Sequence, residues 1–417
     1  AIRGSAPAQI NVPRDYWTQV IDIELPPIVR FERQGGGKDA IQRAAKMLSD
    51  AKFPVILSGA GVVIGDAINE CKALAEKLDA PVCNGYQHND SFPGSHPLAV
   101  GPLGYNGSKA AMQLISKADV VLALGTRLNP FSTLPGYGID YWPKNANIIQ
   151  VDMNPDRIGL TKKVTVGIAG DAKQVAKQIF DKLSSNAGDS GREDRKNLIH
   201  QTKSAWLQTL TSLDHEDDDP GTVWNKEARE RDKDRMSPRQ AWRAIQAAMP
   251  EDAIISSDIG NNCAIGNAYP TFEKPRKYLA PGLFGPCGYG FPSILGAKIG
   301  CPDTPVIGFA GDGAFGISMN EMSSCAREEW PAITMVIFRN YQWGAEKRNS
   351  ILWFDDNFVG TELDPELSYA KVANACGLKG VTVKTMEETT KAIKQSCEDQ
   401  KKGITTFIEI ILNQELG

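Results

Sequence analysis

The sequence of 417 residues lacks the features that mark several common classes of protein. Its eight cysteines lie scattered in apolar or helical stretches and include no Cys-x-x-Cys pair, which argues against zinc or disulfides and favours reduced, buried thiols. No apolar stretch is long enough to span a membrane. The first nine residues do not combine a charged start with an apolar core, as a signal peptide would. We therefore expect a cytoplasmic protein without a membrane partner.

Basic residues are not in excess either. The 46 lysines and arginines are outnumbered by 50 aspartates and glutamates, for a net charge of -4. Because binding to a phosphate backbone needs a concentrated basic face, nucleic acid is not expected as a partner. Anionic small molecules remain possible through local arginines and lysines. A chain of this length exceeds what one core usually serves, so two or three domains are expected.

Two short apolar runs in the last third of the chain have the character of neighbouring strands in a parallel sheet. The runs at 305–310 and 333–338 lack polar alternation and are rich in Ile, Val and Phe, as strands buried on both faces are. The segment 314–330 between them has helical spacing and ends before a proline. A strand, helix, strand unit is therefore predicted.

Polar residues follow both of these predicted strands. Asp312 lies in a Gly-Asp-Gly tripeptide after the first strand, and Asn340 lies just after the second. The carboxyl ends of neighbouring parallel strands meet at one sheet edge, where open α/β sheets bind ligands. Gly311 and Gly313 let the backbone approach a phosphate, and carboxylate and amide oxygens suit Mg²⁺. In this setting the tripeptide predicts a metal-diphosphate site, although alone it is more often an ordinary turn.

Alternating strands and helices predict the α/β class with parallel, doubly wound sheets. We expect a central α/β domain over residues 28–184 and a domain that binds diphosphate and metal over residues 237–417. The polar residues 185–236 between them are interpreted as a partly helical surface linker. Residues 8–13 predict a strand, and residues 1–27 are interpreted as the tail of a truncated domain. Within the two domains, strands are expected at 54–57, 80–83, 119–124, 148–151, 253–256, 305–310, 333–338 and 405–411.

Two motifs of the central domain leave alternatives open. Gly59-Ala60-Gly61 follows a predicted strand and precedes Gly65, which resembles a dinucleotide fingerprint, but the third glycine lies one residue too late. A strand-to-helix turn without a ligand is the more frequent explanation. Asp152 ends another strand, where it could face a ribose or form a turn that caps the next helix.

Three segments of the second domain could complete a site around Asp312. The segment 258–262 follows a strand and offers glycine backbone and amide groups to a diphosphate, or forms a polar turn. The glycine-dense segment 285–290 allows either close approach to a flat ligand or close helix packing. Lys347 and Arg348 could clamp a sulfonate, carboxylate or phosphate, or form a solvated basic turn.

These motifs together resemble those of the thiamine-diphosphate-dependent acetohydroxyacid synthase and pyruvate oxidase superfamily. The matching segments are 75–78, 149–152, 258–262, 285–290, Gly311-Asp312-Gly313 and Arg339-Asn340. Within the superfamily, the likeness is strongest to the branch that acts on sulfoacetaldehyde, at residues 9–17, 280–290 and 339–360. The resemblance extends over essentially the whole chain.

The resemblance implies thiamine diphosphate and Mg²⁺ as cofactors. Asp312, the Asn340 side chain and the Gln342 carbonyl would bind Mg²⁺, and diphosphate oxygens and water would complete its coordination. The Gly285 carbonyl and the Cys287 N–H would serve the pyrimidine ring, with Cys287 in place of the methionine common in acetohydroxyacid synthases. The groups implied at the diphosphate are Gly260, Asn261, Asn262, Gly311, Gly313 and Ala314.

The implied activity is conversion of sulfoacetaldehyde and phosphate to acetyl phosphate and sulfite, as in the degradation of taurine and other sulfonates. Lys347 and Arg348 are the candidate contacts for these anions. The superfamily's activating glutamate lies in an N-terminal domain of which this chain contains only what resembles the last strand. We therefore expect this chain to hold half a site, to be inactive alone, and to assemble as a homodimer or homotetramer. The alternatives are a synthase or oxidase that acts on a 2-oxoacid, and a non-catalytic cofactor-binding fragment.

Overall fold

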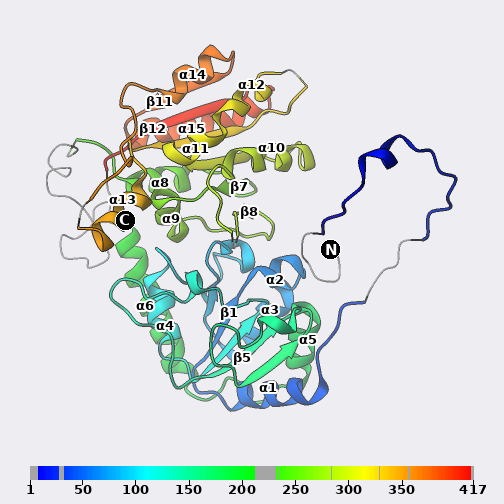
Figure 1. The fold of residues 1–417 in the computed structure, drawn as a ribbon. Helices are drawn as coiled ribbons and strands as arrows, with labels where there is room; N and C mark the ends of the chain where they lie inside the picture. Colours follow the sequence, from blue (N-terminus) through cyan, green and yellow to red (C-terminus); the bar gives the residue numbers. More distant parts are fainter. Residues whose placement is uncertain are drawn as a thin grey trace.

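The computed structural model describes residues 8–27, 32–211, 232, 234–282, 284–327, 329–355 and 357–414. Figure 1 shows two α/β lobes, the first in blue to green and the second in yellow-green to red, with residues 8–27 as an arm beside them. Each lobe is built on one parallel sheet of six strands. The predicted α/β class with two parallel-sheet domains is confirmed.

The first sheet has the strand order β3-β2-β1-β4-β5-β6. Its strands are β1 (Pro54–Ser58), β2 (Val82–Asn84), β3 (Ala99–Pro102), β4 (Val120–Leu124), β5 (Asn147–Asp152) and β6 (Val166–Ala169). The helices of this lobe are α1 (Lys38–Asp50), α2 (Ala60–Ile64), α3 (Ile68–Leu78), α4 (Lys109–Ile115) and α5 (Ala172–Lys182). All residues of β1 and β4 are buried, because helices cover both faces of the sheet.

The second sheet has the strand order β11-β12-β10-β9-β7-β8. Its strands are β7 (Ile254–Ser257), β8 (Tyr278–Leu279), β9 (Val306–Gly311), β10 (Thr334–Arg339), β11 (Lys379–Val383) and β12 (Thr406–Ile411). The helices of this lobe are α8 (Pro238–Ala248), α9 (Asn261–Ile265), α10 (Gly290–Gly300), α11 (Asp312–Ser318), α12 (Met322–Cys325), α13 (Gly344–Trp353), α14 (Tyr369–Ala375) and α15 (Met386–Gln400).

The predicted strands form within about two residues of their expected positions, because each is a buried apolar run. The strands missed from sequence are short or contain glycine, as in β3, β6, β8 and β11. The helix predicted at 314–330 forms, but as two short helices that end at Cys325 instead of a single helix that reaches residue 330. Helical structure there begins at Asp312, breaks into a 3₁₀ turn at Met319–Glu321 and ends with α12, since Gly316 and several serines weaken a continuous helix.

The strand predicted at residues 8–13 is wrong as a structural element. These residues are exposed and have no regular structure, and a 3₁₀ turn follows at Arg14–Thr18. A strand needs a neighbour that pairs with its backbone groups, and no described residue provides one.

Across the described part of the chain, no helix is long and apolar enough to cross a membrane.

Buried polar contacts join the two lobes. The Asn89 side-chain amide donates to the carbonyls of Asn267 and Pro270, at 2.8 and 2.9 Å. Asp90 accepts hydrogen bonds from the backbone N–H groups of Lys277 and Tyr278. Because buried polar groups must keep these partners, the contacts fix how the loop after β2 meets the segment before β8.

A long helix, α6 (Arg192–Thr211), occupies most of the described part of the predicted linker. Its Arg195 side chain is 1% exposed. The guanidinium donates to five backbone carbonyls, those of Lys52, Leu78, Asp79, Gly188 and Ser190, at 2.6 to 3.0 Å. These hydrogen bonds anchor helix α6 to the first lobe. All five acceptors are backbone carbonyls, and none is an acidic side chain.

We expect Arg195→Met to lower the free energy of unfolding by about 3 kcal/mol, because it leaves several buried carbonyls without a donor. Urea unfolding monitored by circular dichroism measures the change. Lys196→Met on the same helix changes a half-exposed side chain and is expected to alter stability by less than about 0.5 kcal/mol. Equal effects of the two substitutions would contradict the anchoring role.

Candidate functional site

Asp312 and Asn340 lie at one edge of the second sheet, as predicted. Strands β9 and β10 are parallel neighbours, and Gly311 pairs with Phe338 at their carboxyl ends. Asp312 begins α11 one residue after β9 ends, and Asn340 follows directly after β10. Both side chains are buried. The strand pairing therefore brings together two residues that are separated by a helix in the sequence.

The carboxylate of Asp312 is held by three donors. Its Oδ2 atom accepts hydrogen bonds from Arg339 Nη1 at 2.9 Å and from the Tyr341 N–H at 2.7 Å, and its Oδ1 atom accepts one from the Gly313 N–H at 3.0 Å. Burial raises the pKa of Asp312 to about 6, and Arg339 and these N–H groups partly offset the effect. The carboxylate has a fixed orientation, with acceptor capacity left mainly on Oδ1.

Arg339 connects Asp312 to the segment that precedes α14. Its side chain is fully buried, donates to the carbonyls of Asp364 and Leu367, and lies over the rings of Tyr341 and Tyr369. The Tyr369 hydroxyl in turn donates to the Asp312 carbonyl at 2.9 Å. These contacts hold Asp312 from both its side chain and its backbone.

Glu409 is the second buried acid of this network. It is 1% exposed and accepts hydrogen bonds from Ser368, the Tyr369 N–H and Thr382, while its Oε1 lies 3.9 Å from Arg339 Nε. The roles of Arg339, Tyr369 and Glu409 were not predicted from the sequence. A charged residue inside the apolar strand β12 was the available signal, because such a residue must have a buried partner.

The unpartnered oxygens near Asp312 suit a cation or a polar ligand. The described residues show no hydrogen bond to the Asn340 side chain, and the buried Oε1 atom of Gln342 and Oδ1 atom of Asn262 have no partner there. Among the described residues, no three His, Cys, Asp or Glu side chains are grouped so that they could hold a metal ion. A metal at this edge would therefore rely on carboxylate, amide, backbone and ligand oxygens, which is the chemistry of Mg²⁺ with a phosphate ester.

The loop after β7 reaches the same edge. Gly260 has φ 128°, a conformation that other residues rarely adopt, and a Cβ there would contact nothing within 4 Å. Asn261 and Asn262 begin the short helix α9, which packs against β9. Open space beside Gly260 and buried amides next to it are compatible with a bound diphosphate.

Asp258 organises the glycine-dense segment. Its two oxygens accept hydrogen bonds from the N–H groups of Ile259, Gly288 and Gly290, at 2.7 to 3.0 Å. Burial raises the pKa of Asp258, and these N–H groups partly offset the effect. Gly285 has φ 61°. The structure thus joins segments 258–262 and 285–290 directly, through the Asp258 carboxylate.

The remaining candidates lie around this framework. The ring of Trp343 would be 2.8 Å from a Cβ at Gly313, so only glycine fits there, and Ala314 is buried beside it. Cys287 is partly exposed, and burial raises the pKa of its thiol, with a further increase from Asp258 and Glu346. Its thiol therefore stays protonated at neutral pH.

Lys347 and Arg348 have different surroundings in α13. Lys347 Nζ pairs with Glu362 at 2.5 Å and lies over the ring of Phe358. The Arg348 guanidinium lies over the ring of Tyr105, and its buried Nε atom has no partner among the described residues. Arg348 is the better placed of the two to accept an anion.

The glycine turn of the first lobe has a packing explanation. A Cβ at Gly59 would lie 2.6 Å from the Gly125 carbonyl, and one at Gly61 would lie 2.7 Å from the Gly125 Cα. The backbone of Gly125 therefore packs against these glycines and leaves no room there for a ligand. Asp152 accepts a hydrogen bond from the Asn154 N–H, and Asn154 caps the 3₁₀ turn Pro155–Arg157. Both motifs fit their structural explanations.

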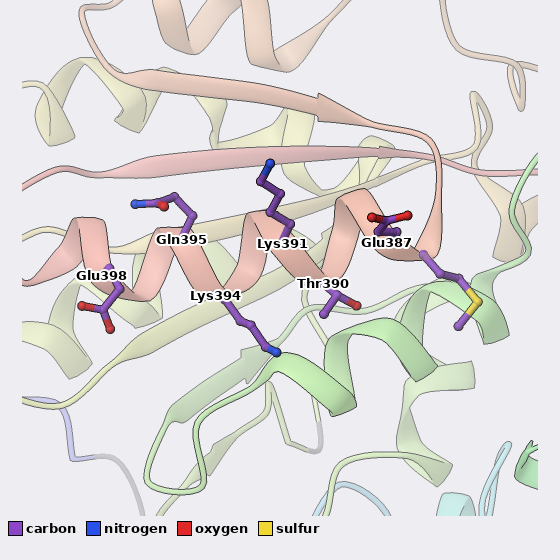
Figure 2. Close-up of a pocket in the computed structure, with 7 residues that line it drawn as sticks. Glu387, Thr390, Lys391, Lys394, Gln395 and Glu398 are labelled. Atoms are coloured by element: carbon purple, nitrogen blue, oxygen red, sulfur yellow. The ribbon is translucent and has the colours of Figure 1, made fainter.

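A shallow hollow of about 530 Å³ along α15 contains none of the candidate site residues. Figure 2 shows the helix with its charged side chains extending from it. Glu387 and Lys391, and likewise Lys394 and Glu398, lie four residues apart, the spacing at which opposite charges on a helix attract. This face has the character of a solvated helix surface.

Comparison with known families agrees with the fold. Residues 41–179 match the family described as "Thiamine pyrophosphate enzyme, central domain". Residues 258–410 match the "Thiamine pyrophosphate enzyme, C-terminal TPP binding domain". Thiamine pyrophosphate is another name for thiamine diphosphate. The chain is therefore a member of the thiamine-diphosphate enzymes, and the site at the edge of the second sheet lies in its cofactor-binding domain.

Similar proteins narrow this class. A "Probable sulfoacetaldehyde acetyltransferase" of Rhizobium meliloti (strain 1021) is 78% identical over the whole chain, which covers 71% of that protein. The sulfoacetaldehyde acetyltransferase of Roseovarius nubinhibens is 73% identical over the whole chain, which covers 69% of it. A "Probable acetolactate synthase large subunit" of Methanococcus aeolicus is 28% identical, over 96% of the chain and 66% of that protein. The chain belongs to the sulfoacetaldehyde acetyltransferase family of acyltransferases.

We expect Asp258→Asn to lower the free energy of unfolding by about 2 kcal/mol, because the amide offers one oxygen to three N–H donors. Thermal and urea unfolding measure this loss. Asp181→Asn at the exposed end of α5 is the matched control and should change stability by less than about 0.5 kcal/mol. A neutral effect of Asp258→Asn would contradict its role in holding the glycine segment.

Proposed function

We propose that this chain provides the diphosphate and Mg²⁺ side of an active site that converts sulfoacetaldehyde and phosphate to acetyl phosphate and sulfite. The single observation that carries the proposal is the convergence of Asp312, Asn340 and the segment 258–262 at one sheet edge, in a chain of this family. A place in the degradation of taurine and related sulfonates follows from that chemistry.

The residues present suit both cofactors. Asp312, the Asn340 side chain and the Gln342 carbonyl would hold Mg²⁺, since all three lie on the two segments that follow β9 and β10. Gly260, Asn261 and Asn262, with the backbone of Gly311, Gly313 and Ala314, would hold the diphosphate. Gly285 and Cys287 would face the pyrimidine ring on the segment that Asp258 fixes.

Thiamine diphosphate, when bound, supplies a nucleophilic thiazolium carbon for attack on the aldehyde. The chain's own residues bind and orient the reacting groups. Arg348 would receive the sulfonate or the phosphate, because its guanidinium can donate two parallel hydrogen bonds to either anion. Lys347 is the weaker candidate, since its ammonium already pairs with Glu362.

The relatives are longer than this chain, which covers 71% of the Rhizobium protein. We propose that the group that activates the pyrimidine ring belongs to sequence outside this chain, so that the chain alone is inactive. We also propose that the protein assembles as a homodimer or homotetramer, because a divided site can be completed between subunits. A cytoplasmic location is a further part of the proposal.

The proposal predicts sulfite release from sulfoacetaldehyde and phosphate in the presence of thiamine diphosphate and Mg²⁺. We expect sulfite release from a fusion of this chain to the part of the Rhizobium relative that the chain does not cover. We do not expect sulfite release from the chain alone. Removal of metal with EDTA should abolish turnover, and added Mg²⁺ should restore it. Pyruvate is the control substrate. Acetolactate formation without sulfite release would favour a synthase, and turnover of neither substrate would reject the proposal.

Arg348→Gln is expected to raise the KM for sulfoacetaldehyde or phosphate about tenfold, because it removes a charge-assisted contact with an anion. The Kd of thiamine diphosphate should stay unchanged. Lys347→Gln is the matched control on the adjacent residue and should alter KM less than about twofold. Unchanged KM values for both substrates with Arg348→Gln would exclude Arg348 as the anion contact.

A further inference from the structure

Tyr105 belongs to the first lobe but lies against the site of the second. It is in the loop after β3, and β3 contacts the 3₁₀ turn Gly266–Ala268 of the second lobe. The backbone of Tyr105 is held from both lobes, because its N–H donates to the Phe131 carbonyl at 3.1 Å and its carbonyl accepts from Asn267 Nδ2 at 3.4 Å. The loop position is therefore fixed where the lobes meet.

The conformation of this loop depends on the residue before Tyr105. Gly104 has φ 89°, and a Cβ there would lie 1.8 Å from the Phe131 carbonyl oxygen. No other amino acid fits that position without a shift of the backbone. Asn106, on the other side, has φ 49°. Two residues in left-handed conformations thus direct the Tyr105 side chain out of the first lobe.

The Tyr105 side chain contacts two separate parts of the proposed site. Its hydroxyl donates a hydrogen bond to Asn261 Oδ1 at 3.3 Å, in the loop proposed to hold the diphosphate. Its ring lies 5.5 Å from the guanidinium carbon of Arg348, the proposed anion contact. Burial raises the pKa of Tyr105, so the hydroxyl remains a donor at neutral pH. Helix α13, which carries Arg348, also packs beside α9, which carries Asn261.

The ring and the hydroxyl have different physical effects. An arginine over an aromatic face is attracted by the ring quadrupole and loses freedom in the direction of its long side chain. The Nε atom of Arg348 stays without a partner in this stacked position. The hydroxyl, in contrast, contributes a hydrogen bond to the orientation of the Asn261 amide. One residue thereby sets the positions of groups on both the cofactor side and the substrate side.

We propose that Tyr105 is a positioning residue through which the first lobe aligns Asn261 for the diphosphate and Arg348 for the anionic substrate. The inference rests on the proposed function for the identity of the two ligands. The two contacts are chemically separable, so the inference makes two independent predictions for one side chain.

Tyr105→Phe removes the hydroxyl and keeps the ring. We expect it to raise the Kd of thiamine diphosphate, measured with Mg²⁺ by tryptophan fluorescence, about fivefold, the effect of one lost hydrogen bond. The KM for sulfoacetaldehyde and phosphate should stay within about twofold. Tyr105→Leu removes both contacts and should raise the Kd similarly, with an additional rise of about fivefold in the KM for the anion that Arg348 binds.

The double variant Tyr105→Leu with Arg348→Gln tests whether Tyr105 acts through Arg348. If it does, the double variant has the KM of Arg348→Gln alone, because the ring has no guanidinium left to orient. Fully additive effects on KM would overturn this half of the inference. An unchanged Kd in Tyr105→Phe would overturn the other half.

Tyr137→Phe is the control, since its hydroxyl donates to the Gly107 carbonyl at 2.9 Å in the same loop. It should change neither Kd nor KM. All variants are made in the protein joined to the uncovered part of the relative, and their unfolding midpoints are compared. Because Tyr105→Phe differs by one hydroxyl, it remains a valid test if the leucine variant folds poorly. Absence of sulfite release from the unsubstituted protein would reject the proposed function, while the Kd comparison still tests the contact with Asn261.

Discussion

The site depends on one buried ion pair, between Asp312 and Arg339. Removing one partner of such a pair leaves an uncompensated charge in the interior, at a cost of about 3 to 5 kcal/mol. Backbone N–H groups bind the carboxylate, and carbonyls and two tyrosine rings surround the guanidinium, whose Nε atom has no hydrogen-bond partner among the described residues and lies 3.9 Å from Glu409 Oε1. The ends of β9 and β10 therefore cannot move apart without exposing or isolating a charge. The proposed metal ligand Asn340 follows directly on this fixed frame.

A second level of organisation comes from acids that accept backbone N–H groups. Asp258 holds the glycine-dense segment, Asp312 holds the turn after β10, and Glu409 holds the start of α14. Each brings loop backbone to a sheet edge without filling the space beside it. This arrangement leaves glycine backbone and amide oxygens free for a ligand, in a domain that matches the thiamine-pyrophosphate-binding family.

The sequence predicted secondary structure best where an uninterrupted apolar run marks a buried strand. Apolar runs such as 305–310 and 333–338 predicted β9 and β10, because strands covered on both faces need no polar residues. Short elements such as β8 and β11 were missed, since their pairing depends on neighbours distant in sequence. The helix predicted at 314–330 is divided and ends early for a local reason, because Gly316 and the serines after it lower the helix propensity.

The amino-acid sequence alone is enough to predict the class of fold, the sheet edge and the pattern of Asp312, Asn340 and glycines, because buried strands and glycine turns leave local patterns in the sequence. Only the tertiary structure decided which partners those residues have. Arg339 lies near Glu409, and Tyr105 contacts both Asn261 and Arg348, although these residues belong to segments far apart in the chain. No local pattern records such contacts, since they form only when two sheets and two lobes pack and each buried polar group must find a partner.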